Sequence, residues 1–211
     1  RGKQSGGRIV KQEAEMERYR KLLEEDSASK LLNFSEKSSI IKRSMQEAQS
    51  QQQRLIRQFG MREAEGYIKE LGYRIEEEEP ELMPHFLYMG IMEPKDRVIR
   101  LNRTVMKLAV SYMKSKSSCE KEQIEKFREI ILFHELYHGI EEQTAGIYTR
   151  NVKVSRRLAG VFTITRRIES ASEIGAIHFS KLMAGASFSP CLYMDYLLAA
   201  IHMHSEVRDE L

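Results

Sequence analysis

Residues 131–140 read ILFHELYHGI, and this stretch decides how the chain can be interpreted. His134 and His138 are four residues apart, and Glu135 directly follows the first histidine. On an α-helix, residues four positions apart project from the same face, one turn from each other. The stretch therefore predicts two imidazoles side by side on one helix, with a carboxylate next to them.

The helix that carries this stretch is predicted to be a main structural element. Apolar and histidine side chains recur at spacings of three and four residues, at Ile124, Phe127, Ile131, His134 and His138. This periodicity indicates one core-facing side of an amphipathic helix. Ser117 is a suitable N-cap, with Glu120 as its capping-box partner, so we expect a single helix from there to about Gln143.

Two histidines at this spacing can share one tetrahedral zinc ion at about 2.0–2.1 Å from each nitrogen. Glu135, next to the first histidine, can accept a proton from water bound to that metal. The alternative is two ordinary histidines and a glutamate in a common helical pair. Both histidines lie on the predicted apolar side, where unpaired imidazoles are costly, which favours the metal site.

Zinc in a catalytic site needs a third protein ligand and keeps its fourth position for water. The next predicted helix, over residues 163–185, offers Glu169, Glu173 and His178. Glu169 and Glu173 are one turn apart and share a face, and both together would crowd the metal. Spacing alone leaves the choice between them open. His178 is chemically suitable, with an ordinary partly buried or surface histidine as the alternative.

The chain around this site has alternating helix and strand signals. We predict a helix in 62–72 ending at Gly72, a strand in 73–79, a β-hairpin formed by 85–92 and 97–102, and a helix in 103–115. Residues 144–155 are expected to be a loop with at most a short strand, and Ser189 with Pro190 to open a last helix. These signals predict an α+β fold: a mostly helical zincin-like domain with a small antiparallel sheet, preceded by N-terminal helices.

Residues 1–60 differ in composition from the rest and are predicted to be a separate N-terminal helical arm or cap. Two helices are expected on either side of a break at EEDSASK, the second from about Ser35 to Phe59. The first seven residues are left out of the fold prediction. A partly disordered tail is the alternative for this half. Residues 61–211 would form the zincin-like domain.

The composition of the 211 residues limits the class of protein. Lysine and arginine number 34 against 31 acidic residues, a mild excess that does not predict direct nucleic-acid binding. The two cysteines, Cys119 and Cys191, form no CxxC pair, and no run is apolar enough for a membrane span or a signal peptide. We therefore expect a cytoplasmic protein with reduced thiols.

HELYH together with SEIGAIHFSKLMAG, residues 172–185, resembles the ImmA/IrrE-type zinc metallopeptidases. Members of that family carry HExxH and then a helix with a glutamate, an alanine three residues later and a Phe-small-x-x-Leu run. The corresponding residues here are Glu173, Ala176, Phe179, Ser180 and Leu182, with Leu182 one position earlier than in that run. The hairpin ending in RVIRLN and the helix–strand opening AEGYIKELGYRI are also similar to the family. The resemblance covers roughly residues 61–198.

The resemblance implies His134, His138 and Glu173 as zinc ligands and Glu135 as general base, and it favours Glu173 over Glu169. The chain departs from the family at Ile177, where an Asn or Asp often supports a ligand histidine. It also has LMAG in place of Leu-Leu-Met-Pro, and an additional helical stretch before the catalytic helix. Support for the ligand histidines must therefore come from elsewhere, and the chain is identified as a divergent member.

The function implied is hydrolysis of peptide bonds by a zinc-activated water, in a regulatory protease that acts on a helix-turn-helix repressor or a similar protein. The candidates for stabilising the oxyanion are Tyr148, Tyr193, Tyr196, His202 and His204. The alternative function is a non-catalytic zincin-fold protein that binds a regulator through its N-terminal helices. Sequence does not identify the substrate or the oligomeric state.

Overall fold

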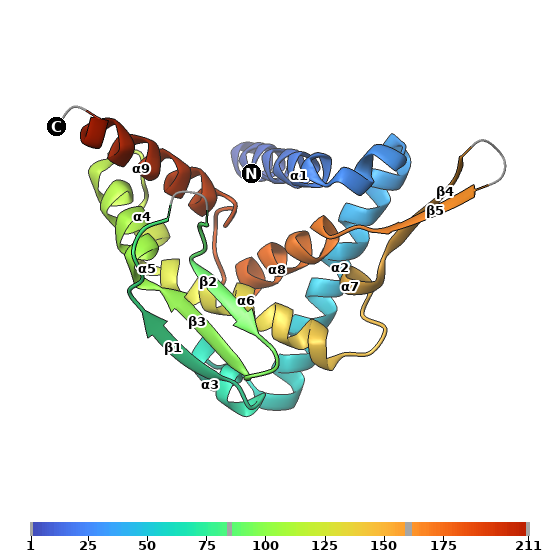
Figure 1. Ribbon diagram of the computed structural model, residues 1–211, viewed down its shortest axis with the longest axis horizontal. Helices are drawn as coiled ribbons and strands as arrows, with labels where there is room; N and C mark the ends of the chain where they lie inside the picture. Colours follow the sequence, from blue (N-terminus) through green and yellow to red (C-terminus); the bar gives the residue numbers. More distant parts are fainter. Residues whose placement is uncertain (1, 84–85, 159–161, 210–211) are drawn as a thin grey trace.

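The computed structural model describes residues 2–83, 86–158 and 162–209, with side chains described for 13–83, 86–157 and 162–204. Figure 1 shows the arrangement of its elements. The elements are α1 (Gly2–Glu25), η1 (Ser27–Leu31), α2 (Phe34–Phe59), α3 (Ala64–Glu70), β1 (Arg74–Glu78), β2 (Gly90–Glu93), β3 (Val98–Asn102), α4 (Arg103–Ser115), α5 (Lys121–Glu125), α6 (Phe127–Gln143), α7 (Tyr148–Asn151), β4 (Lys153–Leu158), β5 (Phe162–Arg167), α8 (Ser170–Met183) and α9 (Leu192–Asp209). The α+β class predicted from the sequence is confirmed.

The three-stranded sheet has the order β1-β3-β2. The predicted hairpin is confirmed, because β2 and β3 pair antiparallel with Gly90 opposite Leu101. The prediction of a purely antiparallel sheet is wrong, since β1 runs parallel to β3. After β1 the chain forms the β2–β3 hairpin, and β3, which is mostly buried, pairs with both β1 and β2. β2 is thus left at the edge.

Helix α6 lies at the centre of the main hydrophobic core. Its buried residues include Leu132, Phe133 and Leu136, which are fully shielded from solvent. It is packed against β2 on one side and α8 on the other, as Figure 1 shows. The helix that carries both histidines is therefore held between the sheet and the helix that carries Glu173.

The predicted single helix from Ser117 to Gln143 is wrong at its beginning. The chain forms two helices, α5 and α6, that meet at Lys126. Glu120 is the N-cap of α5, and its backbone N–H donates to Gln123 Oε1 at 3.2 Å in a capping box. The expected box is thus displaced by three residues, because the Glu120–Gln123 pair satisfies the same kind of backbone donors as a serine cap would.

The region 144–167 also differs from the prediction. Residues 148–151 form the short helix α7, and 153–158 pair antiparallel with 162–167 in a two-stranded ribbon, from Lys153 opposite Arg167 to Leu158 opposite Phe162. The segment TITRR, for which the sequence predicts a helix, belongs to β5. Its β-branched residues favour a strand once a partner strand is available, and the helical pattern begins only after Ile168.

Both predicted N-terminal helices are confirmed as α1 and α2, and α1 begins at Gly2, inside the segment left out of the prediction. Asn33 caps α2 through a capping box with Glu36. Ala48 and Leu55 of α2 belong to the main core. Within residues 13–60, α1, η1 and α2 together contribute buried residues to both hydrophobic cores.

A second, smaller core joins α1, α2 and α8. Tyr19 and Leu23 of α1 are buried there with Ile41 of α2 and Ile174 of α8. Helix α8 therefore contributes to both cores, and it positions α1 relative to α6.

The last helix, α9, begins at Leu192 and not at Pro190, which lies in the turn before it. Among the described residues, no helix is both long enough and apolar enough to cross a bilayer.

Candidate metal centre

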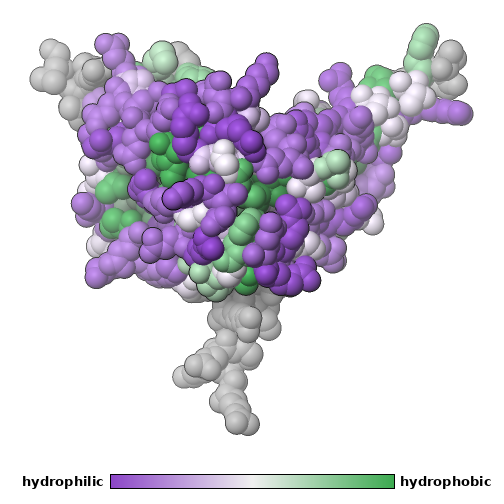
Figure 2. Space-filling model, turned by 90° about the horizontal axis from the view of Figure 1, so that it is seen from below, coloured by the Kyte–Doolittle hydropathy of each residue, from purple (hydrophilic) through white to green (hydrophobic). Residues whose placement is uncertain are grey.

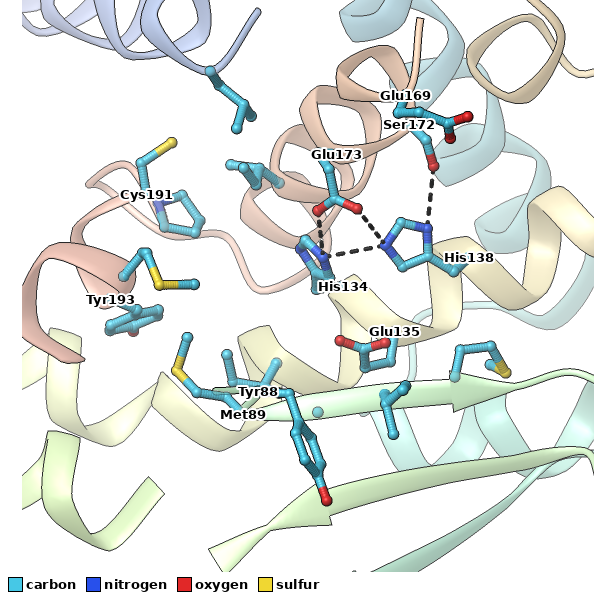
Figure 3. A pocket seen from close by; sticks show the side chains of 18 of the residues that line it. Tyr88, Met89, His134, Glu135, His138, Glu169, Ser172, Glu173, Cys191 and Tyr193 are labelled. Carbon is cyan, nitrogen blue, oxygen red and sulfur yellow. Dashed lines mark hydrogen bonds and ion pairs between the residues drawn. The ribbon is translucent and has the colours of Figure 1, made fainter. Parts of the chain in front are cut away.

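Three side chains meet where α8 crosses α6, as Figure 3 shows. The Nε2 atoms of His134 and His138 are 3.2 Å apart. Glu173, in the first turn of α8, places one carboxylate oxygen 3.3 Å from His134 Nε2 and the other 3.5 Å from His138 Nε2. The sequence predicted that the histidines lie together, and the fold adds Glu173, which is 35 residues after His138 in the chain.

The spacing of these atoms fits a metal ion. Ligand atoms bound tetrahedrally at about 2.0–2.1 Å from zinc are about 3.3–3.4 Å from one another. The three distances at this site lie on both sides of that value. Within the part of the chain that the structure describes, this is the group of histidine, cysteine and acidic side chains whose ligand atoms, all within 4.8 Å, could hold a metal ion.

Glu135 is buried between the histidine pair and strand β2. Burial raises the pKa of its carboxyl, while the nearby imidazoles and the Met92 backbone N–H oppose that effect. Gly90 provides the room for this side chain: a Cβ there would lie 2.8 Å from Glu135 Cγ and 2.9 Å from Ile131 Cγ2. The carboxylate is therefore held beside the candidate metal site by the edge strand.

A buried glutamate that the sequence did not point out supports His138. The Nδ1 atom of His138 is 3.1 Å from Glu141 Oε2, and Ser172 Oγ donates to the same oxygen at 2.5 Å. Thr149 donates its hydroxyl to the other oxygen of Glu141. Burial disfavours the charge on Glu141, but the hydrogen bonds from His138, Ser172 and Thr149 hold its pKa below the usual range.

Such a carboxylate orients a ligand histidine and fixes its tautomer. With the proton on Nδ1 directed to Glu141, the Nε2 lone pair of His138 faces His134 and Glu173. Glu141 thus supplies the support that Ile177 cannot give. The available signal was its position three residues after His138, which places it on the neighbouring helical face.

The side chains around His138 carry more negative than positive charge. Burial lowers the pKa of His138, but the Glu141 hydrogen bond and the charges of Glu173 and Glu135 outweigh it and raise the pKa to about 9. Burial raises the pKa of Glu173, and its contacts with His134 and His138 outweigh that effect and lower the pKa to about 2. Among the described residues, no ion pair joins a lysine or arginine to these three carboxylates. A bound cation would balance them.

The other two candidate ligands lie elsewhere. Glu169 is exposed and its carboxylate is paired with the guanidinium of Arg167, two residues before it. His178 faces α1, where its Nδ1 is 3.4 Å from the Tyr19 hydroxyl. The arrangement of Glu173 therefore agrees with the choice that the family resemblance implied.

The candidate metal centre lies in an open cleft of about 870 Å³. One wall is the edge strand β2, with Gly90, Ile91 and Met92. The opposite side is formed by α8, by the end of α1 and by the start of α9. Arg18 of α1 and Asp195 of α9 form an ion pair of 2.5 Å between those two elements. A segment of extended chain can thus reach the three ligand side chains.

The hydroxyls of two predicted oxyanion candidates, Tyr193 and Tyr196, contact Gln123 and not the candidate centre. Tyr193 borders the cleft but donates its hydroxyl to the Gln123 carbonyl at 2.8 Å, and Tyr196 donates to Gln123 Oε1 at 3.0 Å. Tyr148 is stacked under the Arg43 guanidinium, 4.0 Å from its ring centre. His202 and His204 are exposed on α9 and do not border the cleft.

Comparison with known proteins provides no match. No family model matches the chain, and no curated protein or solved structure is significantly similar to it. The resemblance to the ImmA/IrrE-type metallopeptidases thus stays a prediction that rests on the motifs themselves.

Proposed function

We propose that this chain is a zinc-dependent peptidase, with His134, His138 and Glu173 as metal ligands and Glu135 as general base. The observation that carries the proposal is the convergence of these three side chains in one cleft. Within the part of the chain that the structure describes, the nearby carboxylates of Glu135, Glu141 and Glu173 form no ion pair with a lysine or arginine. Two imidazoles and one carboxylate are the donor set of many catalytic zinc sites, and they leave one position for water.

When bound, zinc would supply a Lewis acid that lowers the pKa of water and polarises a carbonyl. Glu135 would accept the proton of the attacking water and return it to the leaving amine. Its buried position supports this role, because a carboxyl with a raised pKa is closer to the operating pH than an exposed one. His138 would be kept in place by Glu141 during the reaction.

Strand β2 supports a peptide as the substrate. It is the edge of its sheet, and no other described strand pairs with its outer side. An extended peptide can add to such an edge through main-chain hydrogen bonds. The peptide would then run past Gly90, directly next to Glu135. The family resemblance implies a regulatory protein, such as a transcriptional repressor, as the natural substrate.

The first experiment measures the zinc content of the purified chain by elemental analysis, with the His138→Ala variant as control and circular dichroism to verify folding. We expect about one zinc per wild-type chain and a large loss in the variant. A folded wild-type chain that holds no zinc after zinc has been added contradicts the proposal.

The second experiment separates the metal from catalysis. Wild type and Glu135→Gln are incubated with a mixed peptide library, and new termini are identified by mass spectrometry. Glu135→Gln should retain zinc and lose cleavage, by roughly 100-fold or more. Full cleavage by the variant would remove Glu135 from the mechanism. A zinc-loaded wild type that binds a regulator tightly but cleaves nothing would support the non-catalytic alternative.

A further inference from the structure

The ribbon formed by β4 and β5 is unusual in its charge. Its two strands contain five lysine or arginine residues and no acidic residue, although the whole chain has nearly equal numbers of both kinds. The ribbon stands out from the body in two perpendicular views (Figures 1 and 2). A projecting basic ribbon is available to a partner from outside.

The strand register places the charges on a defined face. Side chains alternate between the two faces of a ribbon, and directly paired residues share a face. One face, called the cationic face below, consists of Lys153, Ser155, Arg157, Thr163, Thr165 and Arg167. All six residues are exposed. On the other face Val154 is buried and Arg156 is paired with Glu36 of α2, which ties that side of the ribbon to the body.

The cationic face is continuous with the cleft of the candidate metal centre. Arg167, at the base of the ribbon, borders that cleft, and Lys153 is its direct cross-strand neighbour. Arg157 lies further out on the same face. A polypeptide that leaves the cleft at this end would therefore meet guanidinium, ammonium and hydroxyl groups over about 20 Å, the length of six residues in a strand.

We propose that the cationic face binds an acidic segment of the same polypeptide whose neighbouring segment enters the cleft. The proposal rests on the peptidase function proposed above and assigns to it a substrate class: proteins with an acidic stretch next to the cleaved site. The ion pair of Arg167 with Glu169 does not oppose this binding, because both side chains are exposed and such pairs open at little cost.

An acidic polypeptide fits better than a nucleic acid. Carboxylates of Glu25, Glu142 and Glu169 border the same cleft. A DNA duplex has a phosphate charge for about every 1.7 Å of its axis and would bring negative charge against them. A polypeptide can place its acidic residues on the ribbon and neutral residues near these carboxylates.

The test measures binding of fluorescein-labelled peptides by anisotropy, with the zinc-loaded Glu135→Gln chain so that no peptide is cut. The probes are a peptide rich in glutamate, its counterpart with glutamine in place of glutamate, and a short DNA duplex. The double variant Lys153→Gln/Arg157→Gln removes two charges of the cationic face that lie outside the cleft lining. The matched control, Lys69→Gln/Lys95→Gln, removes two exposed charges far from the ribbon in sequence.

We expect the ribbon variant to bind the glutamate peptide about tenfold more weakly at low salt, with a smaller difference at high salt because exposed charges are screened. The control variant and the glutamine peptide should show no such change. Equal binding of the glutamate peptide by the ribbon variant and the control would overturn the proposal. Binding of the duplex alone, lost in the ribbon variant, would also overturn it in favour of a nucleic acid.

A kinetic experiment keeps this proposal separate from the peptidase function. With Glu135 intact, the ribbon variant should cleave a short neutral peptide as wild type does and show a raised KM for the same peptide extended by a glutamate segment. If the ribbon variant cleaves normally and its KM for the extended peptide equals that of wild type, the docking role is contradicted and the peptidase function is not. Loss of all cleavage in wild type would contradict the peptidase function, and the binding experiment would still decide on the cationic face.

Discussion

His138 and His178 are both partly buried imidazoles near glutamates, yet their pKa values move in opposite directions. Burial lowers both, but the Glu141, Glu173 and Glu135 carboxylates outweigh it at His138 and raise its pKa to about 9. At His178 burial prevails and the pKa is lowered, because the effect of Glu15 is opposed by that of Lys181. The difference lies in the neighbouring charges, and not in burial.

The two surroundings differ in whether they contain their own cation. The cluster of His178 joins α8 to α1: Lys181 donates to Glu15 at 2.7 Å, and the Tyr19 hydroxyl donates to the other oxygen of that carboxylate. Positive and negative charges are balanced there. The cluster of His138 has three carboxylates and no lysine or arginine partner among the described residues. The comparison supports His138 as part of a candidate metal centre and His178 as part of a structural contact.

Among the substitutions that test this difference, replacing Glu173 should reduce zinc binding most. We expect Glu173→Ala to lose zinc almost completely, because it removes a ligand, while Glu169→Ala retains it. The measurement is zinc affinity by competition with a coloured chelator, with folding verified by circular dichroism. Loss of zinc in Glu169→Ala with full binding in Glu173→Ala would exchange the roles of the two glutamates.

Glu141→Gln should cause the next largest loss of zinc affinity. The amide keeps the size of the side chain but loses the charge that holds His138, so we expect zinc affinity to fall roughly 10–100-fold. Glu142→Gln is the matched control, since Glu142 is the next residue and is paired with Arg150. Equal affinities of the two variants would show that Glu141 contributes only to packing.

The sequence predicted the elements that depend on local pattern. The hairpin, the N-terminal helices and the face shared by His134 and His138 follow from periodicity and turn residues, and the structure has them. Strand β5 was missed because its state depends on pairing with residues 153–158, and a window around TITRR contains no information on that partner.

The choice of the proposed third ligand also depends on contacts between distant parts of the chain, which the sequence pattern does not contain. Glu169 and Glu173 share a helical face, so spacing could not separate them. The direction of each carboxylate decides: Glu169 is held by Arg167, and Glu173 is turned towards both histidines. Glu141 was missed for a related reason, since its partners Ser172 and Thr149 come from two other helices.

The charge balance of the His178 cluster depends on Lys181, which pairs with Glu15. Lys181→Met removes its cation and leaves Glu15, which is 7% exposed, without an ammonium partner. We expect the free energy of unfolding to fall by about 1–3 kcal/mol, towards the lower end because Lys181 is partly exposed. Zinc content should not change. Urea unfolding of this variant and of Lys69→Met, an exposed control, measures the effect, and a loss of zinc would contradict the separation of the two clusters.

The smallest expected effect is a dependence of stability on pH that originates at His178. Its folded-state pKa is below the usual 6.5, so the folded protein binds a proton less readily than the unfolded chain. The stability that this group contributes is therefore present above about pH 6.5 and is lost as the pH falls towards the lower folded value. Urea unfolding of wild type and His178→Gln, both freed of metal so that the other histidines contribute equally, compares the two slopes. The variant should lose less stability between neutral pH and about pH 5.5. If both proteins lose the same amount, His178 is not held neutral by its burial against α1, and the contrast with His138 has to be explained by the metal site alone.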